Sequence, residues 1–145
     1  MKKLLFTALL AVAIGASAFA SGKEVSIAAI NNFKASFKYA SDIKWTAADN
    51  YVKASFVYNN TRTEALYTPE GEFIGTNIGV SLDELPVKAK RSFARKFGSY
   101  TVKEAIRFEG NDESAYFISA ENEKENVVLK VEDAGQVSVV KSTKK

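Results

Sequence analysis

The chain of 145 residues contains no cysteine and no histidine, and each absence excludes a class of chemistry. Without cysteine there can be no disulfide, no thiolate ligand for structural zinc and no lipoprotein anchor, so stability must come from packing. Without histidine there is no Ser-His-Asp or Cys-His arrangement, and the usual general base at neutral pH is missing. We therefore expect a protein that is not an enzyme and that holds no cofactor and no metal.

Carboxylates are the remaining candidates for catalysis or metal binding. Glu121, Glu123 and Glu125 alternate around a predicted turn, and the pairs Asp112-Glu113 and Glu132-Asp133 lie at other turns. None of them has the loop spacing of an EF-hand calcium site, so we interpret them as solvated turn charges. A hydrolase that uses two carboxylates from distant strands stays open as an alternative, because such a pair leaves no local signature.

The first twenty residues are typical of a signal peptide. Lys2 and Lys3 precede an apolar run over residues 4–14, and Ala18-Phe19-Ala20 gives the small-x-small cleavage pattern. The apolar run is shorter than the ~20 residues that a membrane-spanning helix needs. We predict cleavage near Ala20 and an exported chain, periplasmic or secreted, without a stable membrane anchor.

The charge balance of the mature chain argues against nucleic acid as a partner. Removing Lys2 and Lys3 from 20 basic residues leaves 18, against 17 acidic residues, for a net charge of +1. The mature 125 residues (145 less 20) suit a single domain, and such a domain buries about 65% of its unfolded surface. The sequence does not indicate an oligomeric state.

The mature chain repeats one pattern. Residues 24–40 predict a helix that carries Phe33 and Phe37, and residues 86–97 predict a second that carries Phe93 and Phe97. Several short strands follow each helix, and the last two join at a glycine turn, at Gly71 and at Gly135 respectively. Because all strand links are short, the sheet should be antiparallel.

We predict an α+β fold of two tandem helix-plus-antiparallel-strand units, residues 21–80 and 81–145, within one compact domain 21–145. Together they form one roughly eight-stranded antiparallel sheet with both helices on one face. Asn59-Asn60 is expected to make a hairpin turn, because Asn tolerates left-handed dihedral angles. Ser81 and Glu84 have capping-box spacing, and Gly98 is expected to end the second helix in a left-handed conformation.

Four stretches resemble the PepSY-like family of small exported bacterial proteins, which is also described as β-lactamase-inhibitor-like. They are Phe33-x3-Phe37-x2-Ala40-x-Asp42-Ile43-x-Trp45, Tyr51-Val-Lys-Ala-Ser-Phe56, Glu64-Ala65-Leu-Tyr67-x3-Gly71 and Leu82-x2-Leu85-Pro86. The resemblance spans residues 24–140 and implies a non-enzymatic binding or inhibitory role in the cell envelope. The second unit departs from the pattern, since Ala105 lies near the place of Trp45 and no proline precedes Gly135. No binding residue is carried over, because fold does not fix function.

The open face of the sheet is the predicted binding surface. Tyr51, Lys53 and Ser55 alternate with Val52, Ala54 and Phe56, so burial of the second set would present Tyr51 to solvent. Tyr67 and Tyr116 are further candidates whose register the sequence leaves undecided. Because tyrosine is enriched at binding hot spots, we expect this face to bind a protein or peptide of the cell envelope and to inhibit a peptidase or another envelope enzyme.

The alternative is a carrier or sensor of a small apolar ligand, held between the helices and the sheet. It requires a cavity of ~300 Å³ or more lined by Phe33, Phe37, Phe93 and Phe97. Trp45 is expected to pack under the first helix and not to stack on a ligand. On the second helix, a basic stripe of Lys88, Arg91 and Arg95 is either the wet face of an amphipathic helix or a contact for an acidic partner or lipid headgroups.

Overall fold

The computed structural model describes residues 24–145, and the predicted signal peptide with its cleavage site lies outside the described residues. Helix α2 (Ile27–Ser36) is followed by four strands: β1 (Ser41–Ala47), β2 (Val52–Tyr58), β3 (Thr61–Tyr67) and β4 (Phe73–Gly79). A 3-10 turn η1 (Leu82–Glu84) and helix α3 (Val87–Phe97) then lead into four more: β5 (Thr101–Gly110), β6 (Ser114–Glu121), β7 (Glu125–Val131) and β8 (Val137–Lys144).

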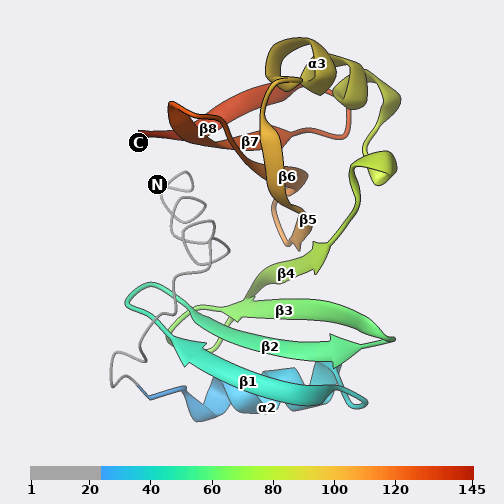
Figure 1. The fold of residues 1–145 in the computed structure, drawn as a ribbon. Helices are drawn as coiled ribbons and strands as arrows, with labels where there is room; N and C mark the ends of the chain where they lie inside the picture. The colour runs from blue at the N-terminus through green and yellow to red at the C-terminus, as the bar shows by residue number, and fades with distance from the viewer. Residues whose placement is uncertain (1–23) are drawn as a thin grey trace.

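All eight strands form one sheet in sequence order, and every neighbouring pair is antiparallel. The predicted α+β fold with a single eight-stranded antiparallel sheet is therefore confirmed. The sheet bends between its halves, so that α2 lies beside β1–β3 at one end and α3 lies at the other (Figure 1). Within residues 24–145, neither helix has the length and apolar character needed to cross a membrane.

The strand register relates the two helix-packing surfaces. Ala65 in the cluster packed with α2 pairs with Thr76, and Thr76 pairs with Glu109 of β5. Four residues back along β5, on the same side, Ala105 pairs with Ile118 in the cluster packed with α3. The residues that pack with α2 and with α3 thus project from one side of the sheet. We call this side the outer face and the opposite side the inner face.

Helix α2 is held at its start by a capping residue and along its length by aromatic packing. Ser26 caps it, because its Oγ accepts a hydrogen bond from the Ala29 N–H at 3.2 Å. The helix ends at Ser36, earlier than the predicted residue 40, because Phe37 leaves helical geometry at φ −125°. Phe33 is 2% exposed and lies 5.3 Å from the ring of Trp45, which confirms the predicted packing of Trp45 under this helix.

Helix α3 begins with the predicted capping residues, but it does not end in the predicted conformation. The Ser81 N–H donates to Glu84 Oε2 at 2.6 Å, and the helix begins directly after Pro86. Gly98 adopts φ −61° and ψ −23°, so the predicted left-handed cap is wrong. The chain instead turns tightly into β5, with the Tyr100 N–H donating to the Phe97 carbonyl at 3.0 Å.

The predicted turns have left-handed dihedral angles where the sequence indicated them. Asn59 and Asn60 adopt φ 49° and 59°, and Gly71 and Gly135 adopt φ 97° and 93°. Each glycine also lies against the first turn of the helix in its own unit. A Cβ on Gly71 would come within 2.6 Å of the Ala29 nitrogen, and one on Gly135 would come within 2.5 Å of Lys88 Cβ. Glycine is therefore required by conformation and by space.

Tyr67 is fully buried under α2, and within the described residues its hydroxyl has no hydrogen-bond partner. Tyr67→Phe should therefore stabilise the fold by about 1 kcal/mol at pH 7, since it removes an unsatisfied buried group without opening a cavity. Burial raises the pKa of Tyr67 to about 12. The unfolded chain loses this proton near pH 10, so between about pH 10 and 12 the folded chain holds the extra proton and its stability falls as the pH rises.

At pH 11 the advantage of Tyr67→Phe over the wild type should accordingly grow by about another 1 kcal/mol. Urea denaturation at pH 7 and pH 11 measures both values. Tyr39→Phe is the control, because Tyr39 is 88% exposed and should change stability little at either pH. A variant at Tyr67 that is less stable than the wild type would contradict the assignment of an unsatisfied hydroxyl.

Candidate functional site: the inner face of the sheet

The inner face carries an apolar cluster although both described helices pack on the outer face. Its seven buried members come from β3, β5, β6, β7 and the turn before β2: Tyr51, Leu66, Ile106, Phe108, Ala115, Phe117 and Val128. In the chain of 145 residues Tyr51 is 4% exposed and Phe117 is 3% exposed. A sheet face that met only water would carry polar residues at such positions. This face therefore has the composition of a contact surface.

A polar cluster lies beside these apolar residues. Glu64 of β3 is at its centre, because Glu64 Oε1 lies 3.0 Å from Lys53 Nζ and Oε2 accepts a hydrogen bond from Asn77 Nδ2 at 3.3 Å. Lys53 and Asn77 are buried, at 7% and 5% exposure. The register explains the grouping, since Glu64 pairs directly with Asn77 and Lys53 is diagonal to Glu64 on the neighbouring strand.

Glu104 of β5 adds a second carboxylate to this electrostatic environment. Burial raises the pKa of Glu104, the negative charge of Glu64 raises it further, and the positive charge of Lys53 acts in the opposite direction. Burial and Glu64 likewise raise the pKa of Tyr51. Counting only Lys53, Glu64 and Glu104, the cluster carries one more carboxylate than cation. A second ion pair, Lys130 with Glu113, lies toward the other end of the face.

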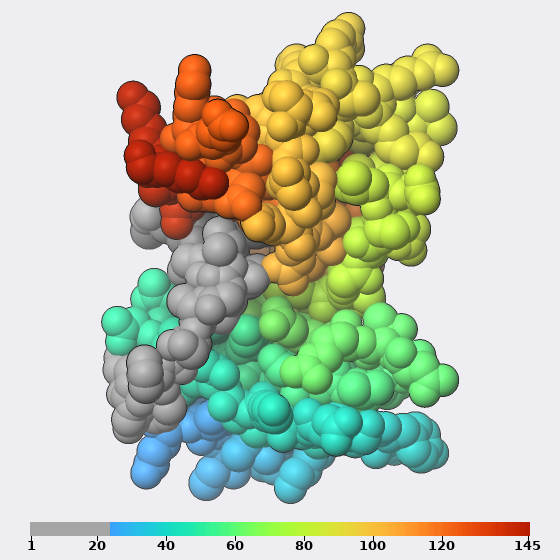
Figure 2. Space-filling view, in the orientation of Figure 1, coloured from blue at the N-terminus to red at the C-terminus, as the bar shows by residue number. Residues whose placement is uncertain are grey.

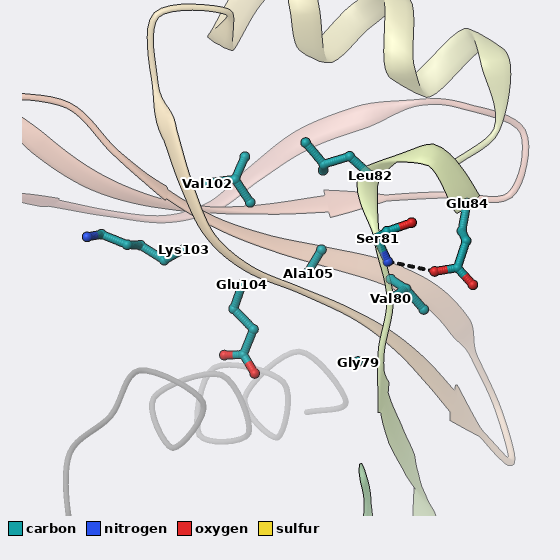
Figure 3. A pocket seen from close by; sticks show the side chains of 9 residues that line it. All are labelled: Gly79, Val80, Ser81, Leu82, Glu84, Val102, Lys103, Glu104 and Ala105. Atoms are coloured by element: carbon teal, nitrogen blue, oxygen red, sulfur yellow. Dashed lines mark hydrogen bonds between the residues drawn. The ribbon is translucent and has the colours of Figure 1, made fainter. Parts of the chain in front are cut away.

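A pocket of about 460 Å³ lies where the linker between the units meets β5, between residues 79–84 and residues 102–105. Figure 3 shows Leu82 and Val102 on the side of α3, whereas the Glu104 carboxylate points to the opposite side of β5. None of the four helical phenylalanines lines this pocket. It is a junction between the halves of the sheet and not the apolar cavity that a ligand carrier requires.

The cavity predicted for a small apolar ligand is not formed as expected. Phe33 and Phe37 pack in the cluster under α2, and Phe93 and Phe97 pack in the separate cluster under α3. The two helices lie at opposite ends of the sheet (Figure 1). The prediction of one cavity lined by all four rings was therefore wrong. Instead, the two rings of each pair pack against each other. Their centroids are 5.3 Å apart for Phe33 and Phe37 and 6.1 Å apart for Phe93 and Phe97.

Three of the candidate residues, Tyr51, Lys53 and Ser55, lie on the inner face, opposite Val52, Ala54 and Phe56. Their exposure differs from the expectation. Tyr51 belongs to the apolar cluster and Lys53 is held by Glu64, so both are buried and the prediction that Tyr51 is presented to solvent was wrong for the chain of 145 residues. Ser55 is half-buried.

The other two candidates, Tyr67 and Tyr116, lie on the outer face and do not join this surface. Tyr67 pairs with Val52 and is buried under α2. Tyr116 pairs with Arg107 and packs at the edge of the cluster under α3, with the guanidinium carbon 4.6 Å from its ring centroid. The register, which the sequence left undecided, therefore places both away from Tyr51, Lys53 and Ser55.

Leu66, Glu64, Phe117 and Val128 belong to the inner face and were not predicted. A signal for Val128 was present, because Val127-Val128-Leu129 is a run of apolar residues in a strand, and such a run indicates burial on both faces. Alternation from Tyr51 could also have assigned Leu66, once the two-residue Asn59-Asn60 turn is taken to set the pairing of β2 with β3.

Two of the turn carboxylates, Glu121 and Glu125, have structural partners. Glu121 pairs with Lys103 at 2.5 Å and with Lys145 at 3.1 Å. Glu125 accepts hydrogen bonds from the Tyr100 hydroxyl at 2.5 Å and from Ser142 Oγ at 2.6 Å. Within the part of the chain that the structure describes, no group of three or more acidic residues is placed to hold a metal ion.

No protein-family model and no curated protein sequence matches the chain. Solved structures match it over most of their length. A candidate periplasmic protein from Bacteroides eggerthii has a TM-score of 0.73 at 19% identity, over 84% of this chain and 90% of that one. A DUF2874 family protein from Bacteroides uniformis has a TM-score of 0.72 at 13% identity, over 83% and 90%.

A BLIP-like protein from Bacteroides fragilis has a TM-score of 0.69 at 16% identity, over 86% of this chain and 89% of that one. At such identities the likeness establishes a shared fold and does not carry residue roles from one protein to another. The chain therefore has the fold of a BLIP-like protein.

Proposed function

We propose that this protein is an exported, PepSY-like, non-enzymatic binding module that holds a segment of another envelope protein on the inner face of its sheet. The observation that carries the proposal is the apolar cluster of Tyr51, Leu66, Phe117 and their neighbours, on the face that neither described helix covers. Clustered apolar residues beside polar ones are the usual composition of an interaction surface. Binding there would inhibit a peptidase or another envelope enzyme by occluding its active site.

The charge of the inner face suggests what the partner presents. The cluster of Lys53, Glu64 and Glu104 has one carboxylate in excess, and burial with a neighbouring carboxylate opposes the ionisation of Glu104. A lysine or arginine side chain from the partner would supply the missing positive charge, and apolar side chains around it would cover Tyr51 and Phe117. We therefore expect a segment with one basic residue flanked by apolar residues.

The fold comparisons support this proposal at a coarse level. One of the solved structures with this fold is named a BLIP-like protein, and another is named for the periplasm. The predicted signal peptide supports the same compartment. Neither comparison identifies a target, so the identity of the bound protein rests on experiment.

A photo-crosslinking experiment tests the proposal. Mature chain 21–145 with a photoreactive phenylalanine analogue at position 51 should crosslink to one envelope protein, whereas the same analogue at Tyr39, which is 88% exposed and outside the sheet, should not. Tyr51→Ala should then lower the affinity for that purified protein by at least about tenfold, as expected for a buried aromatic anchor. Ser55→Arg adds bulk to the same face and should have the same effect without removing a core residue.

Circular dichroism shows whether each variant is folded, and Tyr39→Ala serves as the affinity control. If the folded Ser55→Arg protein binds the partner as tightly as the wild type does, the inner face is not the binding surface. If position 39 crosslinks and position 51 does not, the partner contacts another part of the molecule.

A further inference from the structure

Helix α3 has an unusual charge. Its eleven residues contain five cations, Lys88, Lys90, Arg91, Arg95 and Lys96, and no acid. Helix α2 occupies the equivalent place in the first unit and has one cation, Lys34, within its ten residues. The positive charge is therefore a property of α3 and not of the repeated unit. In Figure 2 the yellow side chains of α3 project from one end of the molecule.

Among residues 24–145, none of these five side chains forms an ion pair. Within residues 24–145, Lys88, Arg91, Arg95 and Lys96 are exposed and form no ion pair, and Lys90 donates from Nζ to the Asp83 carbonyl at 3.2 Å. On the sheet, by contrast, four cations are each paired with an acid, in Lys53–Glu64, Lys103–Glu121, Arg107–Asp133 and Lys130–Glu113.

The acids that precede α3 in the sequence, and those of the turn that lies against it, do not pair with its cations. Glu84 accepts the Ser81 N–H, and Asp133 of the turn beside Lys88 is bound to Arg107. Asp83 and Glu132 are exposed, and neither forms an ion pair with α3. Within the described part of the chain, the four exposed cations of α3 therefore have no ion pair.

The stability of the helix does not account for this pattern. Cations in the first half of a helix oppose its dipole, and Lys88, Lys90 and Arg91 lie there, while the first turn has no acid. Lys88 with Arg91 and Arg91 with Arg95 are like charges one turn apart, which further destabilises the helix. Exposure to solvent alone does not require charges of one sign, because a helix face with both acids and bases is equally well solvated. The pattern indicates a partner that is itself negative.

We propose that the outward face of α3 binds the surface of a bilayer that contains anionic phospholipid. The face defined by Lys88, Arg91, Arg95 and Lys96 extends along the helix, as a flat array of phosphates would require, and clusters of four or more cations on an amphipathic helix are typical of binding to anionic lipid. A protein partner would need a packed apolar centre. The exposed apolar side chains of α3 are only Val87 and Ala94, with no aromatic residue among them.

This orientation is compatible with the proposed inner-face binding but does not depend on it. The cations project from α3, which packs on the outer face, so the inner face would not be the side in contact with the membrane. An exported chain crosses the inner membrane and is released at its surface. Electrostatic binding without a lipid anchor would hold the mature chain there reversibly.

Vesicle co-sedimentation of mature chain 21–145 tests the proposal. We expect binding to vesicles of phosphatidylcholine with phosphatidylglycerol, weakening at high salt, and no binding to pure phosphatidylcholine. The triple variant Lys88→Gln, Arg91→Gln, Arg95→Gln should lower the partition coefficient roughly a hundredfold, at about fivefold per charge. Glutamine is a good helix former, so α3 should remain folded.

The matched control removes the same net charge elsewhere. Lys34, Lys38 and Arg62 are exposed and belong to the first unit, so Lys34→Gln, Lys38→Gln, Arg62→Gln should retain most of the binding. Equal loss in the two triple variants would show a response to net charge alone and would overturn the assignment to α3. Absence of wild-type binding to the anionic vesicles would also overturn it, and would leave an acidic protein as the class of partner to seek.

Discussion

Replacing Gly71 by alanine should destabilise the protein by about 3 kcal/mol or more, which lowers the midpoint of urea unfolding by about 2 M. Gly71 adopts φ 97°, and this backbone conformation is strained for any residue that has a Cβ. The added Cβ would also lie 2.6 Å from the Ala29 nitrogen and 2.9 Å from the Ala28 carbonyl carbon, which are backbone atoms of α2. Relief would require the turn to move away from the helix, and that movement would break the 2.7 Å hydrogen bond from Asn32 Nδ2 to the Gly71 carbonyl.

Gly79→Ala is the matched control. Gly79 ends β4, and a Cβ there meets no heavy atom within 4 Å, so the substitution should change the unfolding free energy by less than about 0.5 kcal/mol. Gly135→Ala should resemble Gly71→Ala in direction, because its Cβ would meet Lys88 Cβ at 2.5 Å at the same place in the second unit. If Gly71→Ala and Gly79→Ala unfold at the same urea concentration, the turn at Gly71 is not packed closely against α2.

The architecture was predictable from the sequence because local signals and periodicity agreed. Glycine turns, the Asn59-Asn60 hairpin and alternating strands each specify one backbone conformation, and the short links within each unit allow only antiparallel pairing. The ends of elements were less predictable. Whether Phe37 stays in α2 or leaves it depends on tertiary packing, since its ring lies 4.8 Å from that of Phe56 on β2.

The candidate surface was only partly predictable, and the reason lies in how the sheet is covered. Tyr67 was assignable in principle, because a two-residue turn that pairs Tyr58 with Thr61 also pairs Val52 with Tyr67. Tyr116 was not, because β6 is apolar on both sides: Ala115 and Phe117 face inward, and Tyr116 and Ile118 face outward. Alternation tells which residues share a face, but when both faces are apolar it does not tell which face the helix covers.

The charged part of the inner face was also hidden from the sequence. Lys53, Glu64 and Asn77 are brought together by pairing among three strands, and each residue alone looks like an ordinary polar position. The charge of α3 was visible from the start as the stripe of Lys88, Arg91 and Arg95. What the structure adds is that, within residues 24–145, these cations have no ionic partner, whereas many cations of the sheet do.

Phe33→Ala should reduce the free energy of unfolding by about 4 kcal/mol, within the range for truncating a buried phenylalanine. Phe33 is 2% exposed and contacts three rings, with centroid distances of 5.3 Å to Phe37, 5.3 Å to Trp45 and 4.8 Å to Phe56. Its contacts with Trp45 and Phe56 are edge-to-face, a geometry that adds about 0.5–1.5 kcal/mol per pair beyond the buried area. Urea denaturation of the mature chain measures the loss.

Phe93→Ala is the control built into the repeat, because Phe93 is the counterpart of Phe33 in α3. Its one close aromatic contact among the described rings is Phe97 at 6.1 Å, and the other buried members of its cluster are aliphatic. We expect its loss of stability to be smaller than that of Phe33→Ala by about 1 kcal/mol or more. Equal losses in the two variants would indicate that the aromatic pairs of the first unit contribute nothing beyond apolar burial.

The same pair of variants tests whether the units unfold together. The single tryptophan, Trp45, packs on Phe33, so its fluorescence reports on the first unit, whereas far-ultraviolet circular dichroism reports on both. Because β4 and β5 pair through five residues on each strand, the sheet is continuous across the two units, and we expect coincident transitions for both variants. A fluorescence transition that precedes the dichroism transition in Phe33→Ala would mean that the β4–β5 pairing does not couple the halves. The inner face, which draws residues from both halves, would then be disrupted when the first unit unfolds by itself.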